Sequence, residues 1–144
     1  MALALAIFAL VVIGGMVAGS FFAGLLEQQG GRNLLIASEA AEAAEGELWR
    51  LVASLPTATL SALPVGGEPL NLPAVPAAGV TLVRRVARLA DNLFLVEARA
   101  VRGDAAGGSL AERSVGLLAS LGLDSASGAQ ILRPIPRRSW LQLY

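Results

Sequence analysis

The sequence contains no cysteine and no histidine. Without cysteine the chain can form no disulfide, no thiolate metal site and no thioether link to haem. Without histidine it lacks the commonest metal ligand and general base, and it cannot bind haem through an imidazole. The serine and carboxylate side chains show no spacing typical of a nucleophile or of an acid–base pair. We therefore expect a protein that is not an enzyme and that uses no cofactor and no metal ion.

The chain also lacks an excess of either charge and is poor in aromatic side chains. Eleven basic residues, all arginine, balance eleven acidic ones, so the formal net charge is zero. This balance gives no support to binding of nucleic acid or of an anionic membrane surface. The seven aromatic residues are scattered along the chain, which argues against conduction along stacked rings.

Charge is missing altogether from residues 1–26, where Ser20 is the one polar side chain among apolar residues and glycine. A helix of this length measures about 39 Å, enough to cross a hydrocarbon core of about 30 Å. The run is about twice as long as the apolar core of a secretory signal, and no basic residue precedes it. A plain transmembrane anchor is the alternative reading. We expect a basic leader to have been removed, which makes Met1 the first residue of a mature chain.

Glycines interrupt the second half of this apolar segment. Gly14, Gly15, Gly19 and Gly24 each weaken a helix by about 1 kcal/mol relative to alanine. Gly15 and Gly19 also form a G-x-x-x-G pattern, which lets apolar helices approach backbone to backbone. We therefore expect non-helical or distorted backbone somewhere within residues 14–24.

Residues 27–55 continue the helix as a polar, alanine-rich, amphipathic segment. An apolar stripe at steps of three and four predicts its buried face. The stripe consists of Leu34, Ala37, Ala41, Ala44, Leu48, Leu51 and Leu55. Four glutamates lie mostly off it, and we interpret them as a solvated face, because no cation-binding loop accompanies them. They are Glu39, Glu42, Glu45 and Glu47. Trp49 is expected to pack at the rim.

The prolines and the alternating residues divide the rest of the chain. Residues 56–79 hold five of the seven prolines, which excludes a central strand and a helix and predicts a long connecting loop. Residues 80–102 predict a β-hairpin that turns at Asp91 and Asn92. Residues 110–121 predict a third strand, with a helix as the competing interpretation. A turn over residues 123–128 and short edge segments over 129–133 and 139–144 complete a head formed by residues 80–144.

The turn fixes an expected register for the hairpin. It pairs Leu89 with Phe94, Ala87 with Val96 and Val83 with Ala100 on one apolar face. The opposite face then carries Arg84, Arg88, Glu97 and Arg99. Arg85 falls on the apolar side, so either it reaches out at an edge or the register differs from this one.

The layout of an apolar helix, an amphipathic helix, a proline-rich connection and an antiparallel meander resembles that of type IV pilins and pseudopilins. The likeness is strongest in residues 25–33 (LLEQQGGRN) followed by residues 40–45 (AAEAAE). These segments are similar to the N-terminal region of PilX-type pilins, where an E-x-x-x-x-x-N stretch leads into an alanine- and glutamate-rich one. The resemblance covers about residues 1–52, and the remainder matches in layout alone.

The resemblance implies an α+β fold, in which a long N-terminal helix packs on a small antiparallel β-sheet. It also implies a structural subunit of an extracellular filament on the cell surface, with a precursor in the cytoplasmic membrane. The implied partners are further copies of the chain, the pilus assembly machinery and a prepilin peptidase, which methylates the new amine of Met1. The implied roles are adhesion, motility or surface display. The residues expected to form the assembly interface are Met1, Leu5, Phe8, Val12, Gly14, Gly15, Gly19, Phe21 and Phe22.

Leu5 departs from the family pattern, because major pilins usually have glutamate at the fifth mature position. That glutamate is thought to pair with a neighbour's N-terminal ammonium, and without it an ammonium buried at Met1 would be costly. Either the amine reaches water or a carbonyl, or the chain is a minor pilin or pseudopilin that primes or caps a filament or a secretion machine. The remaining alternative is a single-pass, membrane-anchored binding module.

Overall fold

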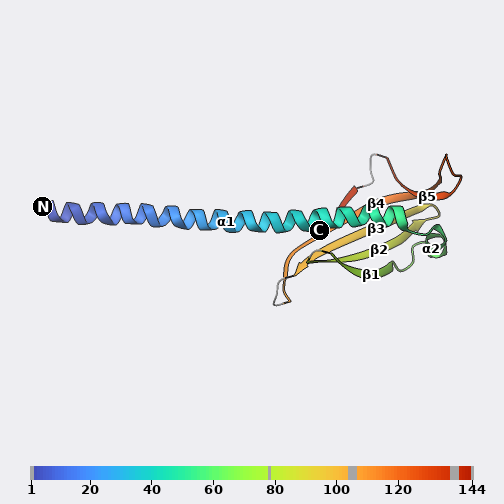
Figure 1. Ribbon diagram of the computed structural model, residues 1–144, viewed down its shortest axis with the longest axis horizontal. Helices are drawn as coiled ribbons and strands as arrows, with labels where there is room; N and C mark the ends of the chain where they lie inside the picture. The colour runs from blue at the N-terminus through green and yellow to red at the C-terminus, as the bar shows by residue number, and fades with distance from the viewer. Residues whose placement is uncertain (1, 78, 104–106, 137–139, 144) are drawn as a thin grey trace. The chain divides into compact units, whose positions relative to one another are not determined.

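The computed structural model describes residues 2–77, 79–103, 107–136 and 140–143 of the chain. Their backbone forms two helices and six strands (Figure 1). In order these are α1 (Ala2–Ser54), α2 (Thr57–Ala62), β1 (Leu70–Ala77), β2 (Val80–Ala90), β3 (Leu93–Gly103), β4 (Ser109–Leu123), β5 (Gln130–Pro134) and β6 (Trp140–Leu143). The chain divides into two compact units, Met1–Leu35 and Ile36–Tyr144. The predicted α+β class is confirmed, although the boundary between the units falls nine residues later than the end of the apolar run.

Helix α1 includes both the apolar and the amphipathic segment, as the sequence predicts. It ends at Ser54 because Pro56 has no amide hydrogen and disfavours helical backbone in the residue before it. The Leu55 amide still donates to the Leu51 carbonyl at 2.9 Å, which closes the last turn.

The expected distortion within residues 14–24 is wrong, because α1 is regular through all four glycines. A Cβ atom placed on Gly14, Gly15, Gly19 or Gly24 would meet no atom within 4 Å other than the adjacent residues and backbone of α1. A glycine lowers helix stability by about 1 kcal/mol. Opening the helix would also break several of its main-chain hydrogen bonds, each with a net contribution of about 0.5–1.5 kcal/mol. The intact helix is therefore the lower-energy arrangement.

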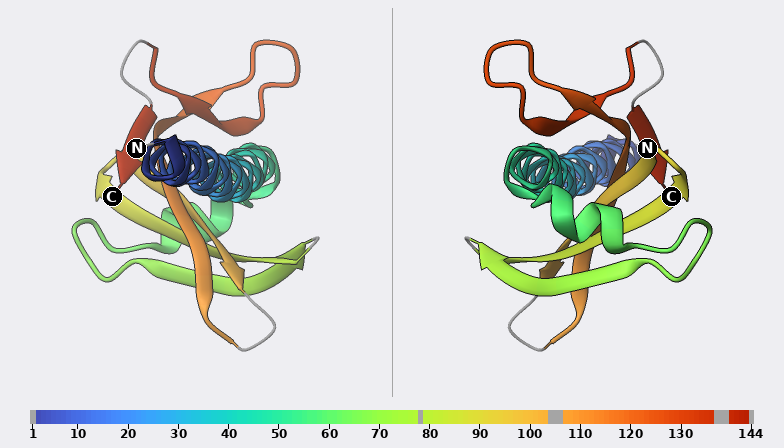
Figure 2. Two further views of the ribbon diagram at one scale, coloured as in Figure 1. Left: turned by 90° about the vertical axis from the view of Figure 1, so that its left-hand side faces the viewer. Right: turned by 90° about the vertical axis from the view of Figure 1, so that its right-hand side faces the viewer.

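The strands form one antiparallel sheet in the order β1-β2-β3-β4-β5, and β6 also pairs with β4. Strand β4 is long enough to pair with β5 along Ala119–Leu123 and with β6 along Ser114–Leu117. The sheet curls about the part of α1 that follows Leu35, with β1 on one side of it and β5 on the other (Figure 2). The predicted third strand and edge segments are confirmed within the described residues.

The core of the second unit lies between α1 and the inner face of the sheet. Ala44, Leu48 and Leu51 are buried there, as predicted. Two expectations are wrong: Leu34 is 74% exposed, and Glu47 is only 4% exposed. The apolar stripe is therefore exposed at Leu34 and becomes half-buried at Ala37. Glu47, expected on the solvated face, points into the core. The sheet supplies its other wall through Leu82, Val86, Phe94, Val96, Ala98, Ala100, Leu117 and Ala119.

The expectation that residues 56–79 form a loop is also wrong, because they include α2 and β1. Pro56 precedes the first helical residue of α2, a position that needs no amide hydrogen, and Leu60 anchors this helix in the core. Strand β1 lies at the edge of the sheet, where proline is tolerated. The register shift between Leu72 and Val75 accommodates Pro73. The exclusion of a central strand therefore holds, whereas the exclusion of a helix does not.

The hairpin of β2 and β3 is confirmed, but its predicted register is wrong by one residue. A β-bulge between Arg88 and Ala90 places Arg88 opposite Phe94. Further along, Val86 pairs with Val96 and Leu82 with Ala100. A shift of one residue exchanges the two faces of a strand. Arg84 and Arg88 therefore belong to the inner face, and Arg85 lies on the outer face opposite Glu97.

The turn between β4 and β5 is held by Asp124. Its carboxylate accepts a hydrogen bond from the Ser127 hydroxyl at 2.6 Å and lies 3.6 Å from an Arg133 nitrogen. The Ser127 hydroxyl lowers the pKa of Asp124, assisted by the backbone amides of Ser127 and Ala126 and by the charge of Arg133.

Because this pKa is lowered in the folded state, Asp124 contributes stability above its unfolded pKa of about 4. That contribution is lost as the pH falls through the folded pKa. We expect Asp124→Asn to flatten the acid side of the stability profile, as followed by urea unfolding at a series of pH values. Ser127→Ala should flatten it in the same direction. An acid profile unchanged in both variants would contradict the assignment.

Candidate assembly surface

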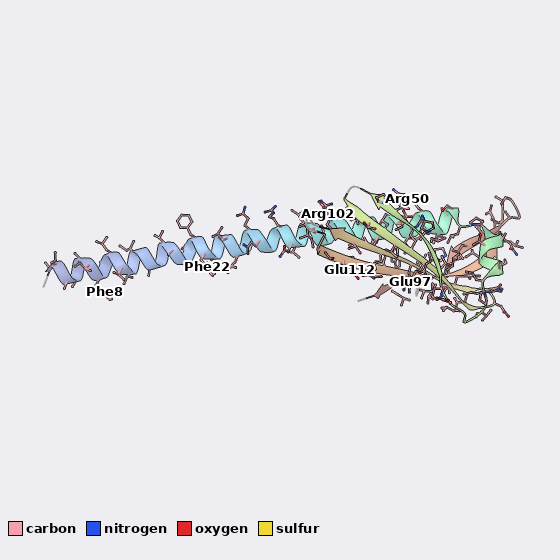
Figure 3. All side chains as sticks on the ribbon, turned by 90° about the horizontal axis from the view of Figure 1, so that it is seen from below. Phe8, Phe22, Arg50, Glu97, Arg102 and Glu112 are labelled. Atoms are coloured by element: carbon pink, nitrogen blue, oxygen red, sulfur yellow. The ribbon has the colours of Figure 1, made fainter. Side chains whose placement is uncertain are left out.

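The largest exposed apolar surface of the described residues lies on α1 from Leu3 to Leu26. Its large side chains are exposed on every side of the helix, so no single face is set apart for burial (Figure 3). They are Leu3, Leu5, Ile7, Phe8, Leu10, Val11, Val12, Ile13, Met16, Val17, Phe21, Phe22, Leu25 and Leu26. A helix that is apolar all round is typically buried on every side, in a protein interior or in a membrane. Removing such side chains from water contributes roughly 1.5–3 kcal/mol each.

The predicted interface residues lie on this surface, apart from Met1, which is outside the described residues. Leu5, Phe8 and Phe21 are each at least 70% exposed, and Val12, at 38%, is the least exposed of the predicted large side chains. Gly14, Gly15 and Gly19 leave open space on the helix surface, enough for another backbone to approach closely. Their role in assembly stays a prediction.

The same helix is long and apolar enough to cross a membrane, and it is the one helix among the described residues for which this holds. Among the described residues, no group of three or more acidic, histidine or cysteine side chains is placed to hold a metal ion. The candidate functional site in the described residues is therefore this apolar surface.

Comparisons with protein families, curated proteins and solved structures found no match to this chain. Any functional conclusion thus depends on the residues themselves.

A buried ion pair that the sequence did not predict connects the elements of the second unit. Glu47, on α1, accepts from Arg84 Nη1, on β2, at 3.1 Å. Arg84 also donates from Nε and Nη2 to the Pro73 carbonyl at 3.1 and 2.7 Å. Arg50 approaches the second oxygen of Glu47 at 3.3 Å but is itself largely exposed. One guanidinium therefore joins the helix, β2 and the edge strand β1.

Arg88, near the end of β2, also joins separate elements of the second unit. Its Nη1 atom donates to the carbonyls of Ser61 and Leu63, and its Nη2 atom donates to the Asp91 carbonyl at the hairpin turn. The guanidinium carbon lies 5.8 Å from the ring centre of Phe94, a cation–π distance. Arg88 thereby holds the end of α2 against the hairpin.

The face of α1 that is not buried in the core of the second unit carries exposed charge. Glu42 and Glu45 are exposed and have no hydrogen bond or ion pair within the described part of the chain. Glu39 differs, because it lies 3.5 Å from Arg102 on β3. Trp49 continues this face, 47% exposed, with its ring centre 5.7 Å from that of Trp140 on β6. The expectations of a solvated glutamate face and of a rim tryptophan are confirmed at these positions.

Proposed function

We propose that the protein is a structural subunit of a helical, type IV pilus-like filament outside the cell. The observation that carries the proposal is the exposed apolar surface that runs all round α1 from Leu3 to Leu26. Outside a membrane, such a surface is removed from water when copies of it pack together. A contact between two different patches of identical chains repeats from copy to copy, and it builds an open helical polymer when its rotation does not close a ring.

The second unit supports this proposal by its construction. It has a core of its own, and its sheet edges carry proline at Pro73, Pro76 and Pro134. Proline on an edge strand blocks strand-to-strand pairing between molecules. Polymerisation through the apolar helix, without uncontrolled aggregation of the heads, is the outcome that this combination favours.

Membrane anchoring is the second candidate, because α1 is also long and apolar enough to span a bilayer. In the filament proposal the bilayer holds the subunit before assembly, so the two differ in the final state. Leu5 favours a further variant, in which the chain is a minor subunit that primes or caps a filament or a pseudopilus.

Electron microscopy of material sheared from intact cells tests the proposal. We expect fibres in which this chain is a main component, with mass spectrometry showing a methylated N-terminus at Met1. Fibres that contain only traces of the chain would indicate the priming or capping role. A chain that is absent from fibres and is extracted by detergent as a monomer would refute the proposal and support the membrane-anchored module.

A further inference from the structure

Two charged side chains near the end of the first unit have no partner within the described residues. Glu27 and Arg32 are both exposed, and they are the first two charged residues of the chain. At about 100° per residue they point about 140° apart around the helix, so they cannot neutralise each other. If this part of α1 is buried in a filament, each requires an opposite charge from another molecule.

The second unit offers such a charge on the outward face of α1. Glu42 and Glu45 are three residues apart, so their carboxylates lie on the same side of the helix. The buried residues Ala44, Leu48 and Leu51 lie toward the sheet, whereas Glu42 and Glu45 are both exposed. Two neighbouring carboxylates repel each other, and one planar guanidinium can bind both. We call Glu42 and Glu45 the acidic pair.

We propose that the acidic pair of one copy receives Arg32 of a second copy and thereby sets the offset between neighbouring subunits. This inference rests on the proposed filament. A second copy is the occupant that fits, because Arg32 supplies the complementary charge on an exposed helical segment. Leu35, 64% exposed and three residues further on, lies on the same side of the helix as Arg32 and provides apolar contact beside the ion pair.

The pairing of Arg32 with the acidic pair predicts the axial offset between neighbouring subunits of the filament. In a helical polymer all copies of α1 run in the same direction. Arg32 opposite Glu42 requires an offset of ten residues, and Arg32 opposite Glu45 requires thirteen. At about 1.5 Å per residue these offsets correspond to about 15–20 Å along the helix.

Site-directed cross-linking tests this offset, because the chain has no cysteine of its own. Gln28 lies one turn before Arg32, and Ser38 lies one turn before Glu42, so Gln28→Cys with Ser38→Cys leaves the charged residues in place. Treating filaments of this full-length variant with a short bifunctional thiol reagent should give a ladder of linked subunits. The matched control, Gln28→Cys with Thr81→Cys on the outer face of the sheet, should give none.

Charge exchange gives a second, independent readout. Arg32→Glu, or Glu42→Arg together with Glu45→Arg, should each lower filament yield about tenfold, because like charges then meet. The combination of all three changes should restore most of the yield. Arg113→Glu, on an exposed arginine of β4, should leave the yield unchanged.

The outcomes separate this inference from the proposed function. If the unaltered protein forms no filaments, the proposed function fails. If filaments form but only the control pair cross-links, or neither pair does, the offset is wrong. If the triple variant is no better than the single reversals, the acidic pair has another occupant, such as a divalent cation, whose addition would then change the yield of the unaltered protein.

Discussion

Replacing Arg84 with methionine is expected to lower the free energy of unfolding by about 3–5 kcal/mol, the usual result of removing one partner of a buried ion pair. Glu47, with a side chain only 5% exposed, would keep its charge in the core and would retain contact only with the exposed Arg50. The Pro73 carbonyl would lose both of its guanidinium donors. Edge strand β1 should therefore loosen first.

Urea unfolding of the detergent-solubilised full chain measures this effect. Tryptophan fluorescence is a suitable signal, because both tryptophans of the chain, Trp49 and Trp140, lie in the second unit and contact each other. The matched control is Arg99→Met. Arg99 lies closer to its partner Glu112, at 2.7 Å, but both side chains are nearly half exposed, so its loss should cost less than about 1 kcal/mol.

A second substitution distinguishes a buried charge from lost packing. Adding Glu47→Leu to Arg84→Met removes the Glu47 carboxylate that the single change leaves in the core without Arg84. A well-packed apolar pair is often as stable as the ion pair that it replaces. The double variant should therefore recover most of the lost stability, a coupling that a double-mutant cycle quantifies. Equal losses in Arg84→Met and Arg99→Met, without recovery in the double variant, would contradict the assignment.

The sequence predicted the elements whose signal is local. The absence of charge in residues 1–26 and the helix-compatible composition that follows indicate α1, and alternating residues around Asp91 and Asn92 indicate the hairpin. Register was not predictable from the same pattern. The β-bulge near Leu89 shifts the register of β2 by one residue. This shift places Arg84 toward the core and Arg85 on the outer face.

Glu47 shows why part of the second unit could not be read from periodicity. Helical spacing places it near Leu48 and Leu51, but a glutamate is assigned to the surface unless its partner is known. That partner, Arg84, is 37 residues away in sequence, on a strand whose facing depends on the bulge. The prolines of residues 56–79 misled in a similar way, because an edge strand tolerates them and a sequence alone does not show which strand lies at an edge.

Replacing Phe8 with aspartate is expected to abolish filament formation while the second unit remains folded. In the proposed filament Phe8, 70% exposed in the single chain, is surrounded by apolar helices of other copies. A carboxylate there would be buried without a partner in every subunit, at several kcal/mol for each. A bilayer tolerates one such residue better, at about 2.5–3.5 kcal/mol at a helix centre and less near an end. Electron microscopy should therefore show no fibres, although the subunit is still recovered with the membrane fraction.

Phe8→Leu is the matched control, because it keeps an apolar side chain of similar size and should assemble normally. Fluorescence of Trp49 and Trp140 should give the same unfolding midpoint for Phe8→Asp, Phe8→Leu and the unaltered protein, since position 8 lies outside the second unit. A midpoint lowered only in Phe8→Asp would show that the substitution acts through folding. Fibres at normal yield from Phe8→Asp would remove the apolar surface of α1 from any role in assembly, because a charge on every subunit cannot be hidden in an apolar filament core at no cost.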